Sequence, residues 1–151
     1  MPHPSTAVFM VIAHRHAETR ILEHLRTGGF EDLTLAQARL AARIGPDGTR
    51  ITELAQASQG TKQTAGFLVD QLERAGYVER QVDPGDARAR LVRIADRGVA
   101  AQQRAREMEE QIEAEWERHL GRTRMRQLRQ ALIDLREITD PFYDPAEERG
   151  V

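Results

Sequence analysis

Apolar residues recur at intervals of three and four along most of the chain, which is the spacing of one face of an α-helix. This pattern is interrupted at glycine and proline clusters and predicts six helices. They cover about residues 6–26, 35–42, 52–57, 61–75, 99–120 and 122–140. The sequence therefore predicts a mainly helical protein.

Polar residues and glycines mark the ends of several of these helices. Thr34 and Thr52 stand where a hydroxyl can accept a hydrogen bond from a free backbone N–H, so they are expected to cap the second and third helices. Residues 58–60, Ser-Gln-Gly, predict a tight turn before the fourth helix. Gly76 follows that helix and is expected to close it in the left-handed conformation.

Two short runs after Gly76 change from helical to extended character. Residues 77–78 and 91–94 are rich in aromatic and branched apolar side chains, which favour strands. Residues 83–90 between them contain Pro84 and Gly85 and predict a hairpin whose tip is longer than a two-residue turn. A short helix, a turn, a longer helix and a hairpin, in this order, indicate a winged helix-turn-helix that binds duplex DNA.

The terminal helices are long and apolar on one side only. Their stripes include Val8, Val11, Ile12, Leu128, Leu132 and Leu135. A small winged domain does not cover such stripes, so pairing with a second chain is expected. The expected fold class is mainly α with a small β-wing. Residues 1–32 and 99–151 would carry the N- and C-terminal dimerisation helices and residues 33–98 the winged helix-turn-helix, as a single intertwined domain.

The composition fits a small soluble protein. The chain has 151 residues, of which 40% are hydrophobic and 30% charged, and this length suits one ordinary domain. No apolar run approaches the roughly 18 residues of a membrane span. The first residues lack the blocks of a secretory signal, so a cytoplasmic location is expected. Cysteine is absent, and no nucleophile, base and orienting group form a motif, so neither an enzyme nor a cofactor is expected.

Charge is distributed unevenly, although the net charge is only −2. Residues 107–117 carry several glutamates and no basic residue, whereas arginines outnumber aspartates in residues 80–97. The predicted hairpin is therefore the basic part of the chain, where phosphate would be met. The glutamate run is most simply a solvated helix face. Its expected partners, across the dimer, are Arg122, Arg124, Arg126 and Arg129.

Four segments carry a resemblance to a known family. They are Leu33-Thr34-Leu35-Ala36-Gln37, Ile51-Thr52-Glu53-Leu54-Ala55, residues 68–80, and Asp83-Pro84-Gly85-Asp86-Ala87-Arg88. In helix order, and most sharply over residues 51–98, the chain resembles the MarR family of bacterial transcription regulators. The resemblance implies a homodimer that binds a palindromic operator in double-stranded DNA, acts as a repressor and responds to a small aromatic effector.

The resemblance also implies which residues meet DNA. The recognition helix would begin with Thr61, Lys62, Gln63 and Thr64, and the wing would present Arg88 and Arg90, with Asp86 orienting the arginine. Lys62 is the only lysine among 22 basic residues. Its position rather than its rarity supports a DNA contact, because an isolated surface lysine is usually solvated. A surface ion pair between Arg88 and Asp86 is the plain alternative, and both roles are compatible.

The sequence departs from the family's pattern inside the recognition helix. Gly66 and Phe67 stand where a polar and often basic pair is common. An outward Phe67 would contact a thymine methyl group, whereas an inward one would join the core. Both alternatives stay open, and the operator sequence is not transferable from relatives.

The remaining candidates have plain alternatives. His14 and His16 are candidates for a ligand cleft; on a helix they point in different directions, which argues against a metal site. Trp116 is expected in the core or dimer interface rather than around an effector. A winged helix can also serve as a protein-interaction module without DNA binding. The wing arginines and the capped recognition helix favour DNA over that alternative.

Overall fold

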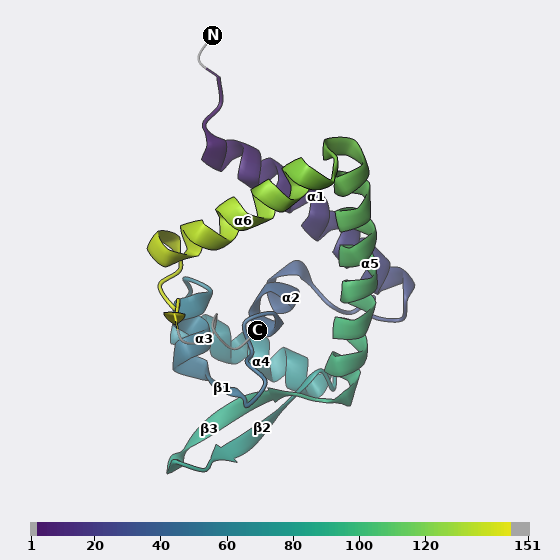
Figure 1. Ribbon diagram of the computed structural model, residues 1–151. Coiled ribbons are helices and arrows are strands. Elements are labelled where there is room, and N and C mark those ends of the chain that lie inside the picture. The colour runs from purple at the N-terminus through teal and green to yellow at the C-terminus, as the bar shows by residue number, and fades with distance from the viewer. Residues whose placement is uncertain (1–2, 146–151) are drawn as a thin grey trace. The chain divides into compact units, whose positions relative to one another are not determined.

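A computed structural model describes residues 3–145, which form six helices and one small antiparallel sheet (Figure 1). In chain order the elements are α1 (Thr6–Thr27), α2 (Leu35–Ala41), β1 (Thr49–Arg50), α3 (Ile51–Ala57), α4 (Lys62–Arg74), β2 (Val78–Asp83), β3 (Asp86–Ile94), α5 (Asp96–Leu120) and α6 (Arg122–Thr139). The expected fold class, mainly α with a small β-wing, is confirmed.

The described residues fall into two compact units. Residues 3–109 contain α1 to α4, the sheet and the first half of α5, and residues 110–145 contain the rest of α5 and α6. The predicted division at residues 32 and 98 stays a prediction. No helix in residues 3–145 is long and apolar enough to cross a membrane.

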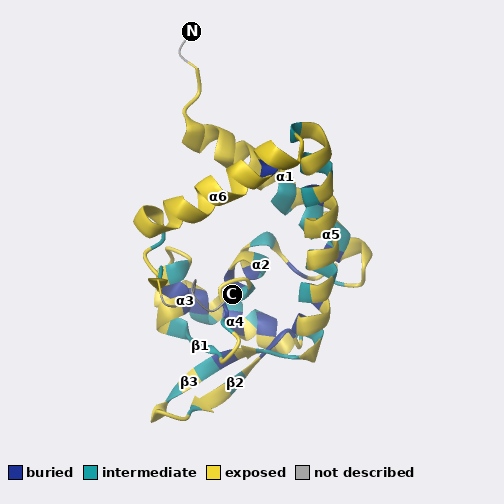
Figure 2. Ribbon diagram, in the orientation of Figure 1, coloured by how far each residue is buried: buried dark blue, intermediate teal, exposed yellow. Residues whose placement is uncertain are grey.

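The hydrophobic core of the first unit is built around the helix pair α3 and α4 (Figure 2). Leu54 of α3 and Val69 and Leu72 of α4 are fully buried, as is Val92 in the strand β3. Leu25 near the end of α1 is also part of this core. Burial of these side chains fixes which face of α4 points inward, and thereby which face is left for a partner.

The start of α2 follows the capping chemistry expected of threonine. The Thr34 hydroxyl accepts a hydrogen bond from the Gln37 N–H at 3.2 Å, and the Gln37 side chain accepts one from the Thr34 N–H at 3.0 Å. This reciprocal pair is a capping box. The predicted cap at Thr52 is wrong, because α3 begins one residue earlier, at Ile51, and Arg50 is its capping residue. The cause is the strand β1, which the sequence pattern missed and which ends at Arg50.

The sheet has the order β1-β3-β2 with antiparallel neighbours. Both hairpin strands are longer than predicted, and a two-residue turn, Pro84-Gly85, joins them. The predicted tip longer than two residues is therefore wrong. Pairing nevertheless shifts between Val82 and Asp83, so three residues of β3, 87–89, have no partner in the β2 register. Such an irregularity bends a strand. The unpaired residues lie in the segment that the sequence pattern assigned to the hairpin tip, although they belong to β3.

Gly98 sets the distance between α5 and the hairpin. It lies inside α5, which begins at Asp96, so the helix starts earlier than expected. A Cβ atom at this position would lie 2.2 Å from the Tyr77 carbonyl oxygen. Only glycine allows the two backbones to approach so closely.

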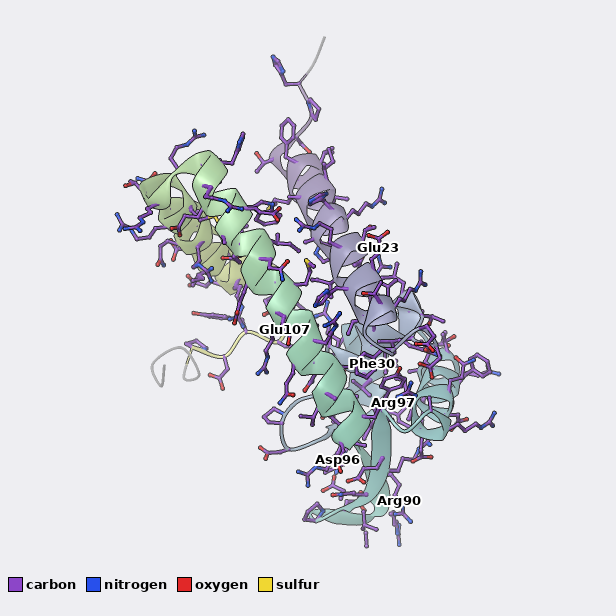
Figure 3. All side chains as sticks on the ribbon, turned by 90° about the vertical axis from the view of Figure 1, so that its right-hand side faces the viewer. Glu23, Phe30, Arg90, Asp96, Arg97 and Glu107 are labelled. Carbon is purple, nitrogen blue, oxygen red and sulfur yellow. The ribbon has the colours of Figure 1, made fainter. Side chains whose placement is uncertain are left out.

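A polar cluster beside the core joins α5 to the loop after α1. Both terminal nitrogens of Arg97 donate to Asp32 at 2.9 Å, and the Tyr77 hydroxyl donates to the same carboxylate at 2.6 Å. The Arg97 guanidinium also lies 4.3 Å from the centre of the Tyr77 ring and 5.9 Å from that of Phe30 (Figure 3). The hydrogen bond from Tyr77, followed by that from Arg97, lowers the pKa of Asp32, which keeps the carboxylate charged.

In the second unit, Ile112 and Met125 are buried and Trp116 is half-buried. Ion pairs join its two helices within one chain: Arg122 lies 3.6 Å from Glu117, and Arg129 contacts Glu113. The expectation that these arginines pair with the glutamate run across a dimer is therefore corrected for both residues, because Gly121 turns the chain back on itself at a φ of +85°.

Candidate nucleic-acid interface

The start of α4 is an exposed, capped helix N-terminus. The Thr61 hydroxyl accepts a hydrogen bond from the Thr64 N–H at 3.1 Å and also bonds the Thr64 hydroxyl at 2.9 Å. Thr61, Lys62, Gln63 and Thr64 are all exposed. The remaining free N–H groups and the positive end of the helix dipole at this terminus favour an anion such as phosphate.

The outward stripe of α4 continues from this terminus. Ala65, Val69 and Leu72 face the core, so the helical period of 3.6 residues places Gln63, Phe67 and Arg74 on the opposite side. Phe67 is 61% exposed. The structure thus decides between the two alternatives for Phe67: its side chain faces solvent and does not join the core.

Arg80 of the hairpin offsets part of the negative charge in the second half of α4. Arg80 of β2 donates to Asp70 at 2.6 Å and to Glu73 at 2.7 Å. These two carboxylates would otherwise repel a DNA backbone that lies along the helix. Arg80 was counted among the basic residues of the hairpin, but in the structure it is bound to these two acidic groups.

Arg50 and Asp83 fix the position of the hairpin. Two nitrogens of the Arg50 guanidinium donate to one carboxylate oxygen of Asp83, at 2.5 and 2.8 Å, so β1 and the end of β2 are held together. The Gly85 N–H donates to the other oxygen at 2.8 Å. The Gly85 N–H and then Arg50 lower the pKa of Asp83, so the pair stays charged. The residues next to Arg50 in the sequence do not indicate this role, because its partner lies 33 residues away.

Asp86 contacts the main chain of the wing. Its carboxylate accepts a hydrogen bond from the Arg88 N–H at 3.0 Å, which closes a local turn after Pro84-Gly85. Within residues 3–145 it makes no ion pair with the Arg88 guanidinium. The expectation that Asp86 orients that guanidinium directly is corrected to an effect on the backbone that carries Arg88.

Three arginines of β3 remain available to a ligand. Arg88, Arg90 and Arg93 are exposed, and none of them forms an ion pair with another part of the chain that the structure describes. Figure 3 shows Arg90 on the hairpin. Arg93 donates only to the neutral amide of Gln81, at 3.2 Å, and Arg90 only to backbone carbonyls nearby. The hairpin therefore presents unneutralised positive charge. Arg93 was not among the predicted site residues, although its alternation with Val92 on a strand placed it on the exposed face.

A separate cavity of about 690 Å³ lies in the first unit between α1, α2 and the first half of α5. Most of its lining is apolar, including Leu22, Leu25 and Ile21, and its polar and charged lining includes His14, Arg39 and Arg106. His16 does not line this cavity. Arg39 donates to Glu18 at 2.6 and 2.8 Å, and this hydrogen bond lowers the pKa of Glu18. No group of three histidine or acidic residues in the described ranges is arranged to hold a metal ion.

A model of the MarR family matches residues 31–89, which extend from the loop before α2 into β3. Within these residues the chain is similar to the MarR family. No curated protein matches the chain in sequence.

Solved MarR-family structures share the fold over most of the chain. A crystal structure of MarR has 25% sequence identity and a TM-score of 0.71, covering 89% of this chain and 96% of that one. The apo form of MarR from E. coli has 20% identity and a TM-score of 0.70, covering 89% and 98%. A mutant of MepR from S. aureus, bound to an oligodeoxyribonucleotide, has 18% identity and a TM-score of 0.59, covering 88% and 96%.

The MarR-family match does not contain every predicted site residue. It includes the start and outward stripe of α4, together with Asp86 and Arg88, but ends before Arg90 and begins after His14 and His16. The DNA-facing assignments from the sequence thus lie mainly in the matched region, and the ligand-facing ones lie outside it.

Proposed function

We propose that this protein is a sequence-specific DNA-binding transcription regulator that acts as a homodimer on a palindromic operator. The observation that carries this proposal is the charge of the exposed surface: Arg88, Arg90 and Arg93 have no acidic partner in the described chain, whereas Arg80 offsets part of the negative charge of α4. The binding of MepR, which has the same fold, to an oligodeoxyribonucleotide also supports it.

In this proposal the two exposed elements have different roles. Helix α4 enters the major groove, where Gln63 bonds a base edge and Thr61, Lys62 and Thr64 contact phosphate or a methyl group. The β2–β3 hairpin places its arginines against the phosphates or the minor groove beside that site. Base contacts would set the sequence preference, and arginine contacts would set the general affinity.

Ligand response is a further part of the proposed function. The cavity lined by His14 has the size of typical small-molecule pockets and an apolar wall, which suit an aromatic effector. An effector that favours a spacing of the recognition helices unsuited to successive major grooves would release DNA, and the protein would act as a repressor. Phenols and aromatic carboxylates added to a DNA-bound sample test this part. Release of the operator supports it, and unchanged affinity across the panel contradicts it.

The decisive experiment selects bound duplexes from random DNA and measures their affinity by fluorescence anisotropy over a range of salt concentrations. We expect a recovered palindrome and an affinity that falls steeply with salt, because phosphate contacts release counterions. Gln63→Ala should weaken binding to the selected palindrome and leave random duplex almost unaffected. If the protein binds no duplex, or if its affinity does not depend on salt, the result would instead support the alternative function of a protein-interaction module.

A further inference from the structure

Phe67 is an unusual residue for an exposed helix face. It is the only large apolar side chain of α4 that is exposed, and at 61% it is more accessible than most apolar residues of residues 3–145. Its neighbours on the outward side, Gln63 and Asp70, are polar. On the outward side of α4 the ring thus stands between polar side chains, and it fits a small apolar target within polar surroundings.

Gly66 beside it gives a second, independent observation. Glycine destabilises a helix interior relative to alanine, so it normally has a local reason. Here the fold supplies none: a Cβ at position 66 would have no atom within 4 Å, and the backbone does not adopt a positive φ. The missing side chain leaves room next to Phe67 for something outside this chain to approach the helix backbone.

From these observations we propose that Phe67 reads the 5-methyl group of a thymine in the major groove, with Gly66 allowing the close approach. This inference rests on the proposed DNA-binding function and names the chemical group that the recognition helix selects. In the major groove the thymine methyl is the apolar group of the base edges, and aromatic side chains are suited to contact it. The hydrogen-bonding edges beside it suit the polar neighbours of Phe67.

Helix geometry restricts where this thymine lies. Phe67 follows Gln63 by four residues, so the two side chains share one face and are separated by about 6 Å along the helix axis. Stacked base pairs repeat every 3.4 Å or so. The methyl group that Phe67 contacts therefore belongs to a base pair within about two steps of the base that Gln63 bonds.

The test replaces thymine by deoxyuridine, which removes the methyl group and leaves every hydrogen-bonding group in place. Each thymine of the selected palindrome is replaced in turn, at symmetric positions, and affinity is measured by anisotropy. At one position we expect the DNA affinity to fall by about fourfold for each methyl group removed, or by about fifteenfold for the symmetric pair. These factors follow from the usual free energy of burying one carbon group. Deoxyuridine at the other positions should have little effect.

Variants assign the effect to Phe67. Phe67→Ala should bind the thymine duplex more weakly and lose no further affinity on deoxyuridine substitution, whereas Phe67→Leu, which keeps apolar surface, should retain part of the discrimination. Phe142→Ala is the matched control, since Phe142 is similarly exposed at 52% and lies in the other compact unit. It should respond to deoxyuridine as the unmodified protein does.

The outcomes separate this inference from the function on which it rests. Sequence-specific binding that no deoxyuridine changes would overturn the role of Phe67 and leave DNA binding intact. A deoxyuridine effect that persists in Phe67→Ala would also overturn it, because another residue would then read the methyl. Absence of binding to any duplex would overturn the proposed function and this inference together.

Discussion

Asp32 is a single carboxylate that three separated segments of the first unit share. It lies in the loop after α1, accepts from Tyr77 before β2 and is paired with Arg97 in the first turn of α5. Arg97 also donates to the Ala75 carbonyl at the end of α4, at 2.7 Å. The start of α5 is thereby tied to the end of α4 through one guanidinium.

The charge of Asp32 should make the stability of the protein depend on pH, and substitution by a neutral residue should remove that contribution. The folded-state pKa is lowered below 3.8, so the stabilisation is fully present above that pH and is lost as the pH falls through the folded value. Asp32→Asn should lower the melting temperature at pH 7 by about 2–4 °C, the effect of roughly 1 kcal/mol in a chain of this size, since the group is partly solvated. The difference from the unmodified protein should shrink near pH 3. A difference that is unchanged between pH 7 and pH 3 would refute the role of the charge.

Gly66 offers a test in which stability and binding should move in opposite directions. Gly66→Ala should stabilise the protein by about 0.5–1 kcal/mol, because the site is open and helical. The same methyl should reduce DNA affinity if the helix backbone lies close to the groove. Thermal melting and anisotropy on one preparation measure both. A more stable variant with unchanged affinity would show that Gly66 does not face DNA.

At the level of elements, local chemistry was predictable and distant pairing was not. The predicted cap at Thr34 and the left-handed Gly76, with a φ of +81°, involve residues within a few positions of one another, so the sequence contains the whole interaction. Strand β1 has only two residues and is defined by its pairing with Val92 and Leu91 of β3. Such a strand has no pattern of its own.

In the candidate site, too, local features were predictable from the sequence and distant contacts were not. The period of the buried residues in α4 was sufficient to place Gln63 and Phe67 on the outward side. The state of each arginine was not predictable, because Arg50, Arg80 and Arg97 find acidic partners on other elements, up to 65 residues away. Composition alone therefore overstated the free charge of the hairpin, which the structure limits to the arginines of β3.

The hairpin should contribute to affinity without contributing much to sequence preference. Arg88→Ala should weaken binding to the selected palindrome and to random duplex by similar factors, and should reduce the slope of log affinity against log salt by about one, since one phosphate contact is lost. Titrations of both duplexes over salt measure this. Arg118→Ala, an exposed arginine of α5 outside the first unit, is the matched control and should leave the slope unchanged. An Arg88→Ala loss confined to the palindrome would instead assign Arg88 to base reading.

At the scale of the whole molecule, each unit leaves apolar surface on a long helix. In α1, Val8, Val11 and Ile12 are 45%, 47% and 57% exposed, and Leu128, Leu132 and Leu135 of α6 are about 40% exposed (Figure 2). The first unit has its own core and does not need these residues for it. Stripes of this kind on terminal helices are the surfaces that we propose a second chain covers.

A charge placed in the apolar stripe of α6 should separate the two chains of the proposed dimer and, as a consequence, lower DNA affinity. Leu132→Glu should convert a species of twice the chain mass into a monomer at micromolar concentration, measured by light scattering, because burial of the carboxylate is unfavourable. Gln127→Glu adds the same charge away from the stripe and should remain dimeric. A monomer engages one half-site at a time, so affinity for the palindrome should fall by a factor of about 10²–10⁴, whereas affinity for a single half-site should change little. If the unmodified protein is a stable monomer at this concentration, or Leu132→Glu remains a dimer, the proposed assembly is wrong.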